Sequence, residues 1–499
     1  MTTTRPSVPD EAEEALARAS RTALPSDPAT RSAFLLPLLD DARAKLAAAA
    51  DRWVEVAAAA KQCEPSEAIA AEELASGPLA VARALAGWRR SLVALRAGRL
   101  PSVQGRVRRA GDARFVPAMP CLPFDRLVFA SHRARGDGLP VVVKLHPLHA
   151  GLRELFASTF AAFADAGCSF VAGDGAFGAT LARDPRVSDV HLTGSRSTFA
   201  ALAQSNAMRP TPARLSAELG NVTPVVVVPG TWRDAELRAR ADDVAAMLSN
   251  NGGFNCASAR VLITARRWPQ RESFLAFLRE RLSALPPRPA WHPGSAARFV
   301  SAGGRPADDG RLPCVLLECA DPDSLPHAFR DEVFAPLLVE HSLDGADLTA
   351  YLRSATQFCA TRLSGDLAAV VLAPRAVLAR DRAAIDGFCG SLRYGTVGLN
   401  VWAAVGFAWM ATPWGAFRDP RGAPSRSGVG FVHDSLLLRA PRRSFLRGPI
   451  LPWPTPAWWP SHRSPRAVME RLLALTLAPS PWRCARVVSS AIAGRARGR

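Results

Sequence analysis

The stretch that decides the fold is Glu218 to Gly230, "ELGNVTPVVVVPG", in which four consecutive valines lie between turn-forming residues. A run that is apolar at every position, rather than at alternate positions, indicates a strand that is buried on both faces. Such strands belong to parallel sheets that carry helices on both sides. The stretch therefore predicts an α/β fold, and it also places a glutamate directly before a glycine turn.

Similar apolar runs alternate with helical patterns on either side of this stretch. After Pro101 the apolar runs are "RLVFA", "LPVVVKL", "DVHLTG", "RVLIT", "CVLLE" and "APLLVEHSL". Helical spacing is clear in "AGLRELFASTFAAFADAG" and, before Pro101, in "PLLDDARAKLAAAADRWVEVAAAA" and "GPLAVARALAGWRRSLVALRAG". We therefore expect N-terminal helices followed by two Rossmann-like parallel-sheet domains with helices on both faces.

The composition is that of a globular protein. The chain has 499 residues, of which 48% are hydrophobic and 21% charged. No run approaches the roughly 18–20 apolar residues that a membrane-spanning helix needs. The N-terminal "MTTTRPSVPDEAEEAL" has acidic residues where a signal peptide has its apolar segment, so we expect a cytoplasmic protein. The nine cysteines form no CxxC pattern, and we expect neither a disulfide framework nor a metal site.

The positive charge is concentrated at the C-terminus. Residues 435–499 contain twelve arginines against one acid, Glu470, and so hold +11 of the net charge of +18. Pro, Trp and Arg dominate from about Pro441, which is typical of an appended segment. We expect three parts: N-terminal helices with a dinucleotide-binding domain (1–221), a catalytic domain (222–432) and a basic C-terminal extension (433–499).

The basic extension admits more than one partner. An anionic membrane surface and a partner chain are both compatible with its composition, and packing within an oligomer is the simplest interpretation. The rest of the chain is only mildly basic, so we do not expect nucleic acid as a partner.

Two glycine turns and one lysine indicate a nucleotide site. The segment 173–178, "GDGAFG", gives GxGxxG after a short apolar run, and Thr193-Gly194-Ser195 follows the next one. Such turns let backbone N–H groups approach a pyrophosphate, although a tight strand-to-helix connection explains either turn alone. Lys144, one of only three lysines, ends the run "PVVVK", where α/β proteins bind ligands. A solvated lysine with a packed stem is the alternative.

A thiol and a carboxylate supply the candidate chemistry. Cys256 lies in "NNGGFNCASAR", and Glu218 lies in "SAELGN". If Cys256 opens a helix, the helix dipole lowers its pKa and free N–H groups can stabilise an oxyanion. Together the two side chains provide a nucleophile and a water-activating base. A small core cysteine and a solvated glutamate are the alternatives for each residue taken alone.

The order of these motifs resembles the aldehyde dehydrogenase superfamily. From about Leu139 to Gly430 the chain has Lys144, "GDGAFG", "LTGS", "ELGN", "NNGGFNCASAR", "DEVFAPLLVE", "YGTVGLN", "PWGAF" and "SGVG" in that order. The family shows a strand-end lysine, a Gly-rich turn, F-T-G-S, E-L-G-G, G-Q-x-C-x-A, E-E-I-F-G-P, G-x-V-x-x-N, P-F-G-G and S-G-x-G. Nine motifs in one order identify the chain as similar to a divergent, bacterial-type branch of the superfamily.

The resemblance implies a role for each matching residue. Cys256 would attack the aldehyde, and Glu218 would activate the water that releases the acid. Asn400 would be structural. Residues that would contact the nicotinamide cofactor are Lys144, Gly173, Gly178, Gly194, Ser195, Glu332 and Phe334. The function implied is NAD(P)-dependent oxidation of an apolar aldehyde to a carboxylic acid, in a homodimer or homotetramer.

Several positions depart from the family pattern. The family's oxyanion asparagine is missing, and Cys121 stands near its expected position. Phe254 replaces the glutamine of G-Q-x-C, and Arg260 follows Cys256 after three residues rather than four. Pro147 replaces a glutamate that NAD-preferring members often carry, so NADP is permitted, and His146 is a candidate to assist it. Two alternatives stay open: an inactive scaffold with a membrane- or partner-binding tail, and a relative that transfers its acyl group to coenzyme A.

Overall fold

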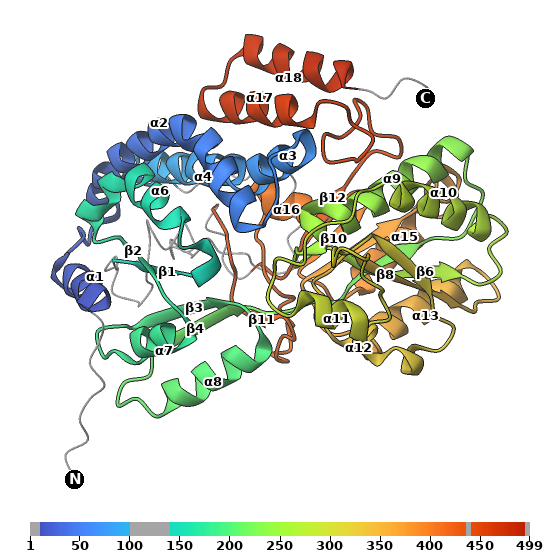
Figure 1. The fold of residues 1–499 in the computed structure, drawn as a ribbon, viewed down its shortest axis with the longest axis horizontal. Coiled ribbons are helices and arrows are strands. Elements are labelled where there is room, and N and C mark those ends of the chain that lie inside the picture. The colour runs from blue at the N-terminus through green and yellow to red at the C-terminus, as the bar shows by residue number, and fades with distance from the viewer. Residues whose placement is uncertain (1–9, 100–139, 436–440, 495–499) are drawn as a thin grey trace.

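The computed structural model describes residues 10–99, 140–435 and 441–494, and its main feature is a seven-stranded parallel sheet (Figure 1). The strand order is β12-β10-β9-β5-β6-β8-β7. The strands are β5 (Thr223–Val227), β6 (Ala259–Ala265), β7 (Val315–Glu318), β8 (Leu337–Leu343), β9 (Ala368–Leu372), β10 (Thr396–Leu399) and β12 (Ser444–Arg447). The valine run forms β5 at the centre, and every residue of β5, β6 and β9 is buried.

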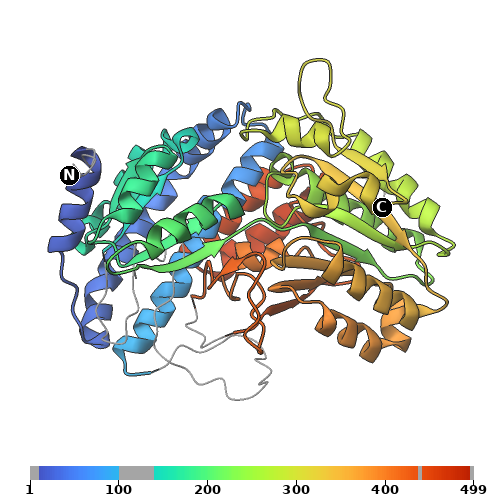
Figure 2. The same ribbon diagram turned by 90° about the horizontal axis from the view of Figure 1, so that it is seen from below.

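Helices cover both faces of this sheet (Figures 1 and 2). The chain passes from β5 to β6 through α9 but returns from β8 to β9 through α13, and right-handed crossovers in opposite directions place these helices on opposite faces. The α/β fold expected from the sequence is confirmed. The helices of this part are α9 (Asp234–Ser249), α10 (Arg271–Ser283), α11 (Ser295–Ser301), α12 (Pro326–Arg330), α13 (Leu348–Thr361), α14 (Arg375–Arg380), α15 (Arg382–Ser391) and α16 (Ala404–Trp409).

The strands that carry the glycine turns form a second, smaller layer. In parallel pairs, β1 lies beside β2 and β3 beside β4, while β11 runs antiparallel to β4. Among the described residues this layer is in two parts rather than one continuous sheet, and the expected strand "RLVFA" lies outside them. Strands of four or five half-buried residues favour such short pairs. The elements are β1 (Val142–Leu145), α6 (Leu152–Thr159), β2 (Ser169–Ala172), α7 (Gly175–Arg183), β3 (Asp189–Thr193), α8 (Arg196–Ala207), β4 (Arg214–Glu218) and β11 (Gly428–Val429).

The N-terminal helices and the C-terminal segment pack together (Figure 1). Within the C-terminal part, α17 lies against α2, α3 and α4, and the Arg43 guanidinium of α2 donates to the Leu477 carbonyl at 2.7 Å. Among the described residues no helix is long and apolar enough to cross a membrane. These helices are α1 (Asp10–Arg21), α2 (Pro28–Ala60), α3 (Glu67–Ser76), α4 (Pro78–Arg96), α17 (Pro465–Leu477) and α18 (Pro481–Ala493).

The C-terminal segment is more closely tied to the α/β core than its composition predicts. Its strand β12 pairs in parallel with β10 as the edge strand of the seven-stranded sheet. The buried indole of Trp459 donates to Asp243 Oδ1 of α9 at 2.6 Å. A four-residue strand flanked by arginines has too short an apolar pattern to be recognised in the sequence. Residues 433–499 therefore include part of the core sheet.

Removing the buried indole should destabilise the protein. We predict that Trp459→Ala lowers the free energy of unfolding by about 3–5 kcal/mol, because it leaves a large cavity and removes a hydrogen bond from Asp243. The neighbouring Trp458 is 36% exposed, and Trp458→Ala should cost only about 1 kcal/mol. Urea denaturation followed by circular dichroism measures both. Equal losses of unfolding free energy in the two variants would show that the Trp459 indole is not held by burial and by its hydrogen bond to Asp243.

Candidate active site

The loop that carries Cys256 is unusually tight. Three consecutive residues, Asn251, Gly252 and Gly253, have positive φ values of 54°, 62° and 77°. A Cβ atom on Gly253 would lie 2.7 Å from the backbone carbonyl of Ala335, so only glycine fits there. Cys256 follows in a turn before β6. The expectation that it opens a helix is wrong, because the β-branched and apolar residues after Arg260 form a fully buried strand.

The thiol of Cys256 meets the carboxylate of Glu218. Glu218 ends β4, and its side chain accepts hydrogen bonds from the Cys256 thiol and from the Trp414 indole, the latter at 2.9 Å. Glu218 and Trp414 are buried, and Cys256 is half-buried. The structure therefore brings together the two residues that the sequence predicts as nucleophile and base.

Both members of this pair have raised pKa values. Burial raises the pKa of Glu218, and the hydrogen bonds from Cys256 and Trp414 oppose that rise. Burial, and after it the negative charge of Glu218, raise the pKa of the Cys256 thiol well above its usual value. The resting nucleophile is consequently a thiol beside a potential proton acceptor, rather than a free thiolate.

A second carboxylate, Glu332, lies beside the same turn. The Asn221 backbone N–H donates to Glu332 Oε1 at 3.4 Å, and a Cβ atom on Gly220 would lie 3.1 Å from Oε2. Burial raises the pKa of Glu332 to about 8, against the lowering effect of the Arg260 guanidinium. The turn that follows Glu218 thus connects both carboxylates predicted from the sequence.

Two cations hold the Cys256 loop in place, and sequence analysis assigned neither of them this task. The buried Arg260 guanidinium donates to the carbonyls of Gly253 and Ala335. On the other side, Lys61, the residue that follows α2, donates to Asn251 Oδ1 at 2.8 Å and pairs with Glu73. Two features of the sequence could have drawn attention to these cations, namely the scarcity of lysine and the altered spacing between Cys256 and Arg260. No local pattern links Lys61 to a loop 190 residues away.

The Asn251 side chain connects Lys61 to later residues of the loop through hydrogen bonds. Its amide Nδ2 donates to the Phe254 carbonyl at 3.3 Å and to Asn255 Oδ1 at 3.1 Å. Asn255 is bonded in turn to Asn250, and it immediately precedes the nucleophile. Lys61 is therefore connected to the position of Cys256 through two side-chain amides.

Lys144 and the first glycine turn share one surface. Lys144 is half-buried on β1, and a Cβ atom on Gly178 would lie 3.7 Å from its Cδ and Cε atoms. A Cβ atom on Gly173 would meet the Phe177 ring at 2.5 Å, so that position requires glycine. Burial lowers the pKa of Lys144, and nearby Asp174 opposes this effect. The Asp174 carboxylate caps α7 by accepting the Phe177 N–H at 2.8 Å.

The second turn presents hydroxyl groups at the start of α8. Ser195 Oγ lies 2.8 Å from both Ser197 Oγ and Thr198 Oγ1, and all three residues are exposed. The Gly194 N–H donates to the Glu218 carbonyl at 3.0 Å, which ties this turn to the thiol–carboxylate pair.

Two further predicted residues lie at strand ends or in loops of the main sheet. Phe334 has a φ of 48°, and its ring centroid is 4.9 Å from that of His292. The Asn400 side chain bonds both backbone groups of Ala373, at 2.8 and 2.9 Å, and so fixes the end of β10. Cys121 lies outside the described residues.

The residues present fit a nicotinamide dinucleotide. Lys144 offers an amine and Glu332 a carboxylate, both suited to ribose hydroxyls. The start of α8 offers backbone N–H groups and three hydroxyls to a pyrophosphate. Within the described part of the chain, a Cβ atom added to Gly175 would meet no neighbouring atom, so the first turn leaves open space at this position.

Known proteins match this arrangement in sequence and in fold. Residues 137–296 match the model of the aldehyde dehydrogenase family. Over 119 residues the chain is 38% identical to alpha-ketoglutaric semialdehyde dehydrogenase 2 of Azospirillum brasilense. These two matches make this part of the chain similar to the aldehyde dehydrogenases. The match to the curated relative spans 22% of this chain and 22% of that protein.

Solved structures resemble the fold over most of its length. An NAD-dependent aldehyde dehydrogenase from Sinorhizobium meliloti is 20% identical, with a TM-score of 0.61 over 85% of this chain and 83% of that one. An aldehyde dehydrogenase from Burkholderia cenocepacia, described as putative, is 17% identical, with a TM-score of 0.62 over 86% and 88%. An indole-3-acetaldehyde dehydrogenase in complex with NAD+ is 19% identical, with a TM-score of 0.59 over 85% and 86%.

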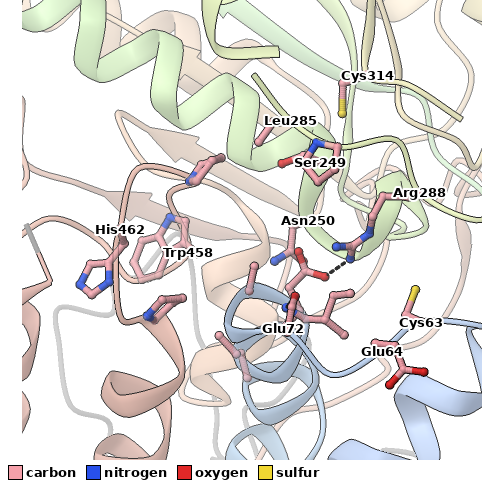
Figure 3. A pocket seen from close by; sticks show the side chains of 18 of the residues that line it. Cys63, Glu64, Glu72, Ser249, Asn250, Leu285, Arg288, Cys314, Trp458 and His462 are labelled. Atoms are coloured by element: carbon pink, nitrogen blue, oxygen red, sulfur yellow. Dashed lines mark hydrogen bonds and ion pairs between the residues drawn. The ribbon is translucent and has the colours of Figure 1, made fainter. Parts of the chain in front are cut away.

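A cavity of about 870 Å³ is lined in part by Ser249 and Asn250, which lie just before the Cys256 loop (Figure 3). The ion pair between Glu72 of α3 and Arg288 crosses its wall, and Asn250 and Trp458 also line it. Cys256 is not among the described residues that line this cavity, so it is separate from the reacting thiol. The cavity instead borders the amides that position the loop.

Neutralising the base should make the nucleophile more acidic. We predict that Glu218→Gln shifts the pH midpoint of Cys256 alkylation downwards, because it removes the negative charge that raises the thiol pKa. Iodoacetamide labelling across a pH series, followed by mass spectrometry of the Cys256 peptide, measures the shift. A midpoint that stays unchanged or rises would contradict the contact between the two side chains.

Breaking the Lys61 link should loosen the loop. We predict that Lys61→Met costs about 3 kcal/mol of stability, because it leaves the buried Glu73 unpaired. The double variant Lys61→Met with Glu73→Gln should recover most of that stability but still show an altered Cys256 alkylation rate. Thermal unfolding and alkylation kinetics separate the two effects. Wild-type alkylation in the double variant would mean that Lys61 serves stability alone.

Proposed function

We propose that the protein oxidises an aldehyde to a carboxylic acid with NAD+ or NADP+, with Cys256 as nucleophile and Glu218 as base. The observation that carries this proposal is the hydrogen bond between the half-buried Cys256 thiol and the buried Glu218 carboxylate, next to the turns that suit a dinucleotide. Residues 1–221 would supply most of the cofactor contacts, and residues 222–432 the thiol.

The chemistry of the chain's own residues follows from this contact. The Cys256 sulfur adds to the aldehyde carbon, and Glu218 accepts the thiol proton as the bond forms. The Cys256 backbone N–H is one donor for the resulting oxyanion. The bound cofactor supplies the hydride acceptor. After the first proton has passed from Glu218 to solvent, Glu218 removes a proton from water, which attacks the thioester carbonyl and releases the acid. The proton then held by Glu218 returns to the departing Cys256 sulfur and restores the free thiol.

The Trp414 indole gives Glu218 a fixed orientation for both proton transfers. Its Nε1–H donates to Oε2, which leaves the other carboxylate oxygen for the thiol or for water. The half-buried Phe407 ring packs 5.7 Å from the fully buried Trp414 ring. Because Phe407 is a partly exposed aromatic side chain beside this hydrogen bond, we propose an apolar aldehyde as the substrate.

The residues after Lys144 support NADP+ over NAD+. Pro147 begins a short 3-10 turn in place of a carboxylate that would repel a 2′-phosphate. His146 Nδ1 accepts the Leu148 N–H at 3.2 Å, which leaves Nε2 available to an anion. Burial, and next the charge of Lys144, lower the pKa of His146, and an anion placed between them would oppose this lowering. We propose a slight preference for NADP+ and a homodimeric or homotetrameric assembly.

Activity of the purified protein tests the assignment. We predict reduction of NAD(P)+ with long-chain or aromatic aldehydes, and a loss on the order of 10⁴-fold in Cys256→Ala, because the nucleophile is removed. Cys63→Ala, which changes a thiol that lines the separate cavity, should keep wild-type activity. Absorbance at the reduced-nicotinamide band follows the reaction.

The alternatives give different outcomes in the same assay. Turnover only when coenzyme A is added would identify an acyl-transferring relative. No turnover across a broad aldehyde panel, together with no cofactor binding by calorimetry, would mean an inactive scaffold.

A further inference from the structure

The outermost helix of the C-terminal segment has an unexpected orientation. In Figure 1, α18 (Pro481–Ala493) lies at the edge of the molecule, on the far side of α17 from the N-terminal helices. Among the described residues it packs mainly on α17. The face of α18 that points away from α17 is therefore exposed, and its side chains determine what this face can bind.

The open face of α18 is apolar. Pro481, Ala485, Val488 and Ile492 follow helical spacing, and all of them are exposed. Trp482, beside them, is 72% exposed, Val488 41% and Ile492 38%. Ser489 and Arg486 are exposed as well and lie along the margin of this stripe. An ordinary surface helix shows the opposite pattern, with apolar side chains towards the protein.

The less exposed face of α18 carries the buried Ser490 together with the half-buried Arg483, Val487 and Ala491. Ser490 is buried, and its hydroxyl bonds the Arg486 carbonyl at 2.9 Å. Arg483 Nη1 donates to the Ala478 carbonyl at the start of the hairpin. Arg471 of α17 donates to the Arg486 carbonyl at 3.1 Å. The less exposed face of α18 thus holds hydrogen-bonded polar groups and apolar side chains, and the apolar stripe lies on the opposite, exposed side of the helix.

The charge around this stripe has a single sign. No acidic residue occurs between Arg471 and the end of the chain, whereas that stretch contains Arg483 and Arg486 and three more arginines at its end. An apolar stripe with an exposed tryptophan, flanked by arginines, is the pattern of a helix that lies in the headgroup region of an anionic membrane.

We propose that the apolar stripe of α18, formed by Pro481, Trp482, Ala485, Val488 and Ile492, docks on an anionic lipid surface. A second copy of the chain fits this face less well. A two-fold contact would bring the same arginine-rich segments against each other, with like charges opposed. A lipid headgroup layer supplies the complementary charge, and the three large side chains enter the acyl boundary. The proposal goes beyond the proposed function and does not depend on it.

Vesicle flotation with the full chain tests the proposal. We expect binding to vesicles of phosphatidylcholine mixed with phosphatidylglycerol, and little binding to phosphatidylcholine alone. The triple variant Trp482→Ser, Val488→Ser and Ile492→Ser should lose at least about tenfold in vesicle partitioning, because three apolar side chains leave the interface. Added salt should weaken wild-type binding, since it screens the arginines.

A matched control distinguishes binding through this stripe from non-specific hydrophobic adsorption to vesicles. Met208→Ser with Val300→Ser removes two side chains that are 83% and 55% exposed on other elements, and it should bind vesicles as the wild type does. Wild-type binding in the triple variant, or no wild-type binding to anionic vesicles, would overturn the proposal. So would analytical ultracentrifugation in which the triple substitution dissociates an oligomer without vesicles present, because the face would then contact a second copy.

Discussion

The active-site geometry depends on one tight loop. Asn251, Gly252 and Gly253 all have positive φ, a backbone conformation that is costly outside glycine and needs external support. Arg260 supplies part of that support from the start of β6, and Lys61, the residue that follows α2, supplies the rest. The loop sits between the N-terminal helices and the parallel sheet, so the position of Cys256 depends on both parts of the molecule.

The electrostatic consequence is a thiol held in its neutral form. Cys256, Glu218 and Glu332 all have raised pKa values, chiefly because burial disfavours their charged forms and then because the carboxylates disfavour a neighbouring anion. The Cys256 thiol becomes nucleophilic because Glu218 lies close enough to accept its proton during the reaction, and not because the thiol is ionised beforehand. It also protects the thiol from unproductive oxidation, which requires the thiolate.

The sequence predicted the fold and the reacting residues better than it predicted their surroundings. The valine run fixed β5 as a central strand because burial on both faces leaves a continuous apolar pattern. Cys256 and Glu218 were recognisable from the order of the motifs. Trp414 was visible only as part of "PWGAF", because its bond to Glu218 spans 196 residues. Long-range contacts of this kind leave no local signal.

The two errors have physical causes of the same type. A helix after Cys256 was plausible from its small residues, but the strand that follows is decided by burial within the sheet. The edge strand β12 is only four residues long, so its pairing with β10 comes from tertiary contact rather than from periodicity. The outward apolar face of α18 likewise required the structure, since composition does not show which side of a helix is covered.

Intact-protein mass spectrometry of Glu218→Gln tests the central claim most directly. The variant is mixed with an aldehyde and NAD+ or NADP+ at a pH above the lowered pKa of Cys256, where the thiolate is present without an acceptor, so that the thioester forms but its hydrolysis is blocked. The account predicts a covalent adduct on Cys256 with the mass of the aldehyde less two hydrogens, and no adduct in the same variant with Cys256→Ala. The absence of this adduct across a panel of aliphatic and aromatic aldehydes, or its appearance on another cysteine, would contradict the account.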